Sequence, residues 1–108
     1  MQAQAEVATA AAAAAYSREH LLNLSPVQVI QRLYDYAILG CKKDDPLLAQ
    51  RALNELIMAL NFDHKEISFG LFRLYDYCKG RIQKRDYRPA LEILEELRAT
   101  WTKAFSLN

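Results

Sequence analysis

A pentapeptide, Arg-Leu-Tyr-Asp-Tyr, occurs twice in this chain of 108 residues, at positions 32–36 and again at positions 73–77. Each copy lies in a stretch whose apolar residues recur every three to four positions, and each is followed by a polar break and a second such stretch. An internal repeat proposes an architecture before any single residue is interpreted. Two copies of a helical hairpin favour a four-helix bundle over a longer solenoid.

The chain is expected to fold as one helical domain. It is long enough to bury a single core without disulfides or a metal. Only 3 Gly and 3 Pro occur, and 52% of the residues are hydrophobic, a composition that favours helices over strands. We predict an all-α protein: an antiparallel up-down-up-down four-helix bundle over residues 25–108, preceded by an Ala-rich helix or arm over residues 1–24.

Two local signals start the first hairpin. Ser25-Pro26, with Gln28 three residues after the cap, has the pattern of a capping box with proline at the first helical position. Asp45-Pro46 repeats the start signal, and Gly40 fits the end of the first helix. These signals predict helices at about 26–40 and 46–60, which a short link makes antiparallel neighbours.

The second hairpin starts with another capping pair, Asp63 and Glu66, and Pro89 opens its second helix. These signals predict helices at about 64–84 and 89–105. Gly70 lies on what we interpret as the apolar side of the third helix, which predicts a close helix approach or room for a partner. The predicted inward stripe of that helix is Ile67, Leu71, Leu74, Tyr75, Cys78 and Ile82.

The segment before Ser25 is rich in alanine, with six consecutive Ala at positions 10–15. Alanine is the best helix former, but its side chain buries little area, so we expect a helical arm that docks weakly. A weakly docked helix and a frayed arm both fit this pattern. The segment has no basic region and no long leucine-rich run, so we predict neither a signal peptide nor a membrane span, and a cytoplasmic protein.

The net charge limits the classes of partner that we expect, and the cysteines indicate the redox compartment. The net charge is +1, with acidic and basic residues interspersed, so no nucleic-acid partner is expected. Cys41 and Cys78 show no CxxC spacing and are interpreted as small apolar residues in a reducing compartment.

No motif in the sequence indicates catalysis. Neither His20 nor His64 has a Glu three residues before it, as a di-iron bundle requires, and two scattered His with two scattered Cys give no zinc spacing. Three separated glycines cannot form a phosphate loop. We therefore predict that the protein is not an enzyme and needs no cofactor or metal.

Acidic and aromatic residues of the repeats are the candidate interaction groups. For Asp35 and Asp76, pairing with an Arg or a tyrosine hydroxyl on a neighbouring helix is the favoured interpretation, and a polar anchor for a bound peptide is the alternative. Six tyrosines occur, four of them in the repeats. Because tyrosine combines a large ring with a polar tip, we expect at least one per repeat to face outward.

The order of several motifs resembles the flagellin-specific export chaperones of the FliS family, over roughly residues 16–105. No single motif is specific; the resemblance lies in their order. They are Tyr16, Leu24-Ser25-Pro26, Leu33-Tyr34-Asp35, the run from Ala59 to Asp63, the run from Leu71 to Tyr77, and the run from Leu94 to Arg98 with Trp101.

The resemblance implies a helical bundle that binds the C-terminal segment of new flagellin, blocks its premature polymerisation in the cytoplasm and delivers it to a component of the flagellar export gate. It also implies that the N-terminal segment covers part of the binding groove when the client is absent. The candidate partner-binding residues are Tyr16 and Leu21 in this lid, and Val27, Tyr34, Ile38, Phe69 and Phe72 in the groove; ordinary core packing is the alternative for about half of them.

Both hairpins are shorter than the family pattern, so a shortened bundle is expected. The resemblance assigns the first pentapeptide mainly to the client-facing side and the second mainly to the core, which predicts unequal burial of the two copies. The competing hypothesis is a divergent helical adaptor or regulatory protein that self-associates or binds another helical partner. Pairing of two copies through the N-terminal arm is a further alternative.

Overall fold

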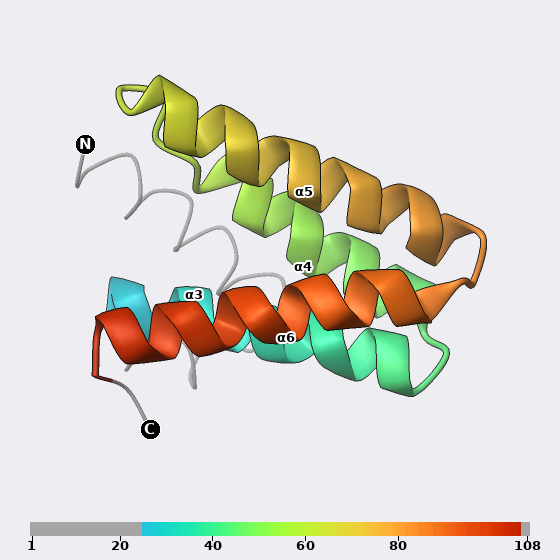
Figure 1. Cartoon of the computed structure of the whole chain (residues 1–108). Coiled ribbons are helices and arrows are strands. Elements are labelled where there is room, and N and C mark those ends of the chain that lie inside the picture. The colour runs from blue at the N-terminus through green and yellow to red at the C-terminus, as the bar shows by residue number, and fades with distance from the viewer. Residues whose placement is uncertain (1–24, 107–108) are drawn as a thin grey trace.

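The computed structural model describes residues 25–106, which are all-helical and contain no strand. Its helices are α3 (Pro26–Lys42), α4 (Pro46–Met58), α5 (Lys65–Gln83) and α6 (Tyr87–Ala104) (Figure 1). Each end lies within two residues of the range predicted from sequence. The predicted N-terminal arm lies outside the described residues.

The four helices pack in a ring. Helix α3 contacts α4, α4 contacts α5, α5 contacts α6, and α6 contacts α3. All four contribute buried side chains to one core, and each fully buried leucine there stabilises the fold by about 1.5–3 kcal/mol. The buried apolar residues are Val29, Leu33, Tyr34, Ala37, Cys41, Ala49, Ala52, Leu53, Leu56, Tyr75, Cys78, Ile82, Ala90 and Leu94.

Two of the predicted helix starts are confirmed. The Ser25 hydroxyl accepts the Gln28 N–H at 3.2 Å, and the Gln28 side chain accepts the Ser25 N–H at 3.0 Å, which completes the capping box. Asp45 accepts the Leu48 N–H at 3.2 Å and so caps α4. These bonds satisfy N–H groups that have no partner inside the helix.

The third predicted cap is wrong, because α5 begins one residue later and His64 is its N-cap. Asp63 instead donates its backbone N–H to the side-chain oxygen of Asn61 at 3.0 Å. Asn favours such turns because its side chain can bond to the backbone two residues on. The turn between α4 and α5 is therefore organised by Asn61 and not by the predicted pair.

Gly40 lies inside α3 and does not end it, as the sequence had suggested. A Cβ at Gly40 would lie 2.6 Å from the Ala49 nitrogen and 2.8 Å from the Ala49 Cβ. Helices α3 and α4 therefore approach closely at this point because Gly40 has no side chain. The predicted close approach at Gly70 is wrong, since Gly70 is exposed and a Cβ there would meet nothing within 4 Å.

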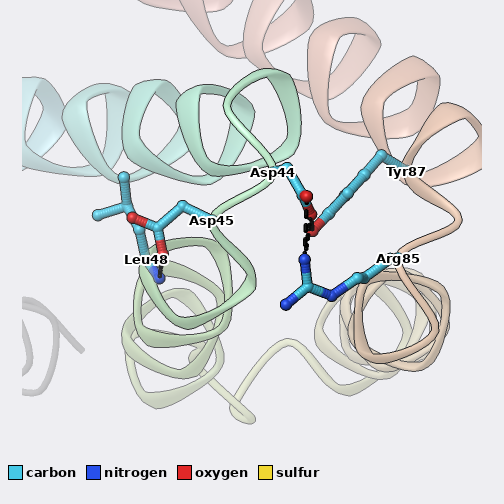
Figure 2. A network of polar contacts seen from close by, with 5 residues as sticks. All are labelled: Asp44, Asp45, Leu48, Arg85 and Tyr87. Carbon is cyan, nitrogen blue, oxygen red and sulfur yellow. Dashed lines mark hydrogen bonds and ion pairs between the residues drawn. The ribbon is translucent and has the colours of Figure 1, made fainter.

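The α3–α4 and α5–α6 turns lie together at one end of the bundle (Figure 2). Both contain a residue in the left-handed region, Asp44 with φ 53° and Arg85 with φ 58°. The Asp44 carboxylate accepts hydrogen bonds from Arg85 Nη1 at 2.8 and 2.9 Å and from the Tyr87 hydroxyl at 2.5 Å. Because Asp44 and Arg85 are largely exposed, this ion pair contributes no more than about 1 kcal/mol.

Candidate functional site

An apolar cleft of about 430 Å³ lies at the opposite end of the bundle, where α3 and α5 begin and α4 and α6 end. Helices α5 and α6 diverge towards this end (Figure 1). All four helices contribute to the cleft, and its larger apolar lining residues are Ile30, Leu56, Leu60, Ile67, Leu71, Leu97 and Trp101.

Tyr34 and Tyr75 lie in the inner part of the cleft lining, only 3% and 2% exposed. Their hydroxyl groups share a hydrogen bond of 2.5 Å, and their ring centroids are 6.3 Å apart. Burial is the largest cause that raises the pKa of both hydroxyls. The pair is therefore neutral at physiological pH, and each hydroxyl satisfies the hydrogen-bonding need of the other in apolar surroundings.

Trp101 forms part of the α6 wall and is held by α3. Its indole N–H donates to the Val27 carbonyl at 3.0 Å, and its ring lies 4.6 Å from that of Phe105, measured between centroids. One residue further, Thr102 accepts a hydrogen bond from the Gln31 side chain at 3.2 Å. These bonds fix the end of α6 against the start of α3.

The burial pattern of α5 shows that part of the predicted inward stripe is wrong. Ile67 is 68% exposed and Leu74 is 37% exposed, whereas Ser68, Tyr75, Cys78 and Ile82 are buried. Successive residues of a helix point about 100° apart. Because Ser68 and Tyr75 face the core, the residues that precede them, Ile67 and Leu74, face sideways. The Ser68 hydroxyl is satisfied there by the Asn61 carbonyl at 2.5 Å.

An exposed aromatic group lies outside the cleft lining. Phe62 and Phe69 meet edge to face with centroids 5.2 Å apart, and Phe62, Phe69 and Phe72 are 40%, 49% and 38% exposed. Exposed aromatic side chains of this kind are candidates for contact with another protein. This group is separate from the Tyr34–Tyr75 pair.

The predicted groove residues do not form one surface. Tyr34 lines the cleft, whereas Val27 holds Trp101 through its backbone carbonyl and Ile38 packs, half-buried, against the core. Phe69 and Phe72 are exposed on α5 outside the cleft lining. The predicted lid residues Tyr16 and Leu21 lie outside the described residues.

The sequence interpretation missed the cleft residues Ile67, Leu71, Leu97 and Trp101 as a binding surface. All four belong to apolar stripes of helical period, which predict a core position as readily as a cleft wall. No signal along the chain separates the two, because the divergence of α5 and α6 depends on packing between distant segments.

The two pentapeptides differ in burial, but in the opposite sense to the expectation. Leu33 is 1% exposed while the equivalent Leu74 is 37% exposed. Tyr36 is half-buried, whereas its equivalent Tyr77 is 48% exposed. The first copy is therefore the more buried one, and the assignment of the second copy to the core is wrong apart from Tyr75.

The acidic residues of the repeats also differ. Asp35 forms ion pairs with Arg98 of α6 and with Arg32 of its own helix. The favoured interpretation, pairing with an Arg on a neighbouring helix, is therefore confirmed for this residue. Its equivalent Asp76 is exposed on α5. Asp35 therefore serves helix packing.

The cleft lining is largely apolar. Within residues 25–106, no three His, Cys, Asp or Glu side chains gather as a metal site. Burial raises the pKa of the Cys41 thiol to about 11 and that of Cys78 to about 12. Since the thiolate is the reactive form, both cysteines are inert at neutral pH.

Across the part of the chain that the structure describes, no helix has both the length and the apolar character needed to cross a membrane. No protein-family model, curated protein or solved structure matches the chain.

Proposed function

We propose that this protein is an export chaperone that binds the C-terminal segment of flagellin. In this role it keeps flagellin from polymerising in the cytoplasm and passes it to a component of the flagellar export gate. The observation that supports the proposal is the apolar cleft lined by all four helices, which offers a helical segment a place to bury apolar side chains. The expected up-down-up-down order of helices belongs to this proposal and is compatible with their ring of contacts.

The cleft is suited to an amphipathic helix. Such a helix places an apolar side chain in a groove every three to four residues, and each one buried contributes about 1.5–3 kcal/mol. Part of that gain is offset by the cost of ordering the segment, about 2–5 kcal/mol or more. Four anchors that each contribute about 2.5 kcal/mol, less an ordering cost of about 3 kcal/mol, give a net affinity of about 7 kcal/mol, which corresponds to roughly 10 μM.

Calorimetry of the full chain with the C-terminal segment of flagellin from the same organism tests the proposal. We expect a dissociation constant below about 10 μM, and Ile67→Glu should weaken binding at least tenfold because it places a charge on the cleft wall. Leu47→Glu is the matched control, since Leu47 is 60% exposed, like Ile67, but does not line the cleft. Absence of binding at tens of micromolar would contradict the proposal.

The N-terminal segment is proposed to act as a displaceable lid. Tyr16→Ala should then leave the bundle folded and change the affinity for the flagellin segment, because a lid competes with the client for apolar surface. Calorimetry and thermal unfolding of the full chain measure the two effects. An unchanged affinity together with a large loss of melting temperature would assign Tyr16 to the core.

A divergent helical adaptor is the second candidate function, and the exposed group of Phe62, Phe69 and Phe72 favours it. An adaptor that self-associates through this group would form a dimer in the absence of flagellin. Light scattering of the free protein and of Phe69→Ser separates the candidates. A dimer that this substitution dissociates would support the adaptor.

A further inference from the structure

The two hairpins of the bundle are equivalent around their turns, with a shift of 41 residues. Helices α3 and α5 end at positions 42 and 83, and helices α4 and α6 begin at positions 46 and 87. The left-handed residues of the two turns, Asp44 and Arg85, are also related by this shift. The equivalence therefore extends well beyond the pentapeptide, to helix ends and turn geometry.

The same shift relates buried residues of the core. Three pairs consist of identical residues, all of them at most 3% exposed. These pairs are Tyr34 with Tyr75, Ala49 with Ala90, and Leu53 with Leu94. At these three positions each hairpin presents the same side chain to the centre of the molecule.

Two hydrogen bonds join residues to their own equivalents. Tyr34 bonds to Tyr75 at 2.5 Å and Arg85 bonds to Asp44 at 2.8 Å, and each pair is separated by 41 residues. A residue meets its own equivalent only near a two-fold axis, as in the isologous interface of a homodimer. The bundle is therefore a pseudo-two-fold pair of hairpins, with the tyrosine pair and the two turns close to the axis.

The interfaces between the hairpins follow the same symmetry. Rotation about the axis exchanges α3 with α5 and α4 with α6, so it converts the α3–α6 interface into the α4–α5 interface, and both are present. Only the connection from Ala59 to His64 makes the pairing intramolecular. An α5–α6 hairpin from another copy would offer the α3–α4 hairpin identical contacts.

We propose that a second copy of this chain can replace one hairpin, so that the α3–α4 hairpin of each copy packs against the α5–α6 hairpin of the other. The exchanged dimer keeps every contact between hairpins and differs only at the Ala59–His64 connection. A connection too short to turn back therefore favours the dimer, and a longer one favours the closed monomer. This inference is independent of the proposed function.

Altering the connection in the full chain tests the exchange. Deletion of Leu60 to Asp63 leaves two residues between α4 and α5, fewer than the three that form each of the other two turns. It should convert the protein to a dimer at about 50 μM, a concentration in the range where such pairing is measurable by light scattering. Insertion of Gly-Ser-Gly after Asp63 is the matched control and should give a monomer. A deletion variant that stays folded and monomeric overturns the proposal.

Chemical cross-linking distinguishes hairpin exchange from association of surfaces. The substitutions Asp44→Cys and Arg85→Cys place two exposed thiols at turns that contact each other. In an exchanged dimer these thiols belong to different chains, so a short bismaleimide should yield a covalent dimer on a denaturing gel. In a dimer formed by surface contact the link lies within one chain, which would overturn the proposal. The protein with only Cys41 and Cys78, both buried, is the control for background reaction.

A refolding experiment on a protein with the unaltered connection tests the proposal even if the deletion variant does not fold. The Asp44→Cys, Arg85→Cys protein is refolded from denaturant at about 1 mM and at about 5 μM, a range over which a bimolecular pairing gains about 3 kcal/mol. A dimer fraction that rises with concentration and is cross-linked between chains supports hairpin exchange. Monomer alone at both concentrations overturns it.

Discussion

Tyr34 and Tyr75 form the most buried polar contact between the two hairpins. Each hydroxyl is the hydrogen-bond partner of the other at 2.5 Å, and both side chains are at most 3% exposed. Removing one hydroxyl leaves the other buried in apolar surroundings without this partner. A buried hydroxyl in that state costs about 1–3 kcal/mol, whereas removal of both can be nearly neutral.

The substitutions Tyr34→Phe and Tyr75→Phe should each lower the free energy of unfolding by about 1–2 kcal/mol, and the double variant should lose less than the sum of the two. Urea denaturation of the four proteins measures this coupling. Equal losses are expected from the two single variants, because the two side chains are buried to the same extent. Additive losses would show that the two hydroxyls act independently.

At the scale of the helices, Gly40 and Gly70 occupy the interiors of α3 and α5 in opposite surroundings. A Cβ at Gly40 would press on the backbone nitrogen of Ala49, which belongs to another helix and cannot move aside alone. A Cβ at Gly70 would meet open space. Alanine is the better helix former at both positions by about 1 kcal/mol, so packing decides the sign of the effect.

Gly40→Ala should therefore destabilise the protein by about 1–3 kcal/mol through overpacking. Gly70→Ala should stabilise it by about 0.5–1 kcal/mol. Thermal and urea denaturation of the two variants provide a matched comparison of one substitution in two environments. Stabilisation by Gly40→Ala would mean that α3 and α4 are less closely packed than the structure indicates.

The helices could be predicted from the sequence because their signals are local. Ser25 with Gln28, and Asp45 with Pro46, act within one helical turn, and these caps are confirmed. The rotation of α5 could not be predicted in the same way. Ile67 and Leu74 continue the apolar pattern as well as Tyr75 does, and only packing against the other helices selects the side that is buried.

The candidate cleft was harder to predict than the helices. Tyr34 was expected in a groove and does line the cleft, but its burial and its bond to Tyr75 depend on the meeting of α3 with α5. The divergence of α5 from α6 depends on contacts between segments far apart in sequence. Periodicity within one helix carries no information about such a distance.

At the scale of the whole molecule, the burial of thiol and tyrosine hydroxyl groups determines how the stability of the fold changes at alkaline pH. Burial raises the pKa of Cys41 to about 11 and of Cys78 to about 12. It also contributes most to raising the pKa of Tyr87 to about 12, with the Asp44 hydrogen bond and charge as further causes. A group whose folded pKa exceeds its unfolded value favours the folded state while it is protonated. That contribution is complete below the unfolded pKa and is lost as pH rises through the folded pKa.

The melting temperature should therefore be constant between pH 7 and about 8.5, the unfolded pKa of a thiol, and should fall progressively up to about pH 12. Circular dichroism melts across this range measure the fall. In a Cys41→Ala, Cys78→Ala variant, the onset should move up to about pH 10, where tyrosine titrates in the unfolded chain. A melting temperature that stays constant to pH 11.5 in the unaltered protein would contradict this account.

The close approach at Gly40 and the contacts around Asp44 join the helices at the end of the bundle away from the cleft. Along α5, Ile67 lies 14 residues from Arg81, or roughly 21 Å at 1.5 Å per residue. Over that length an angle of about 6° corresponds to a displacement of roughly 2 Å. The width of the cleft at Ile67 therefore depends on the angle of α5, and a difference of a few degrees equals about the radius of a methyl group.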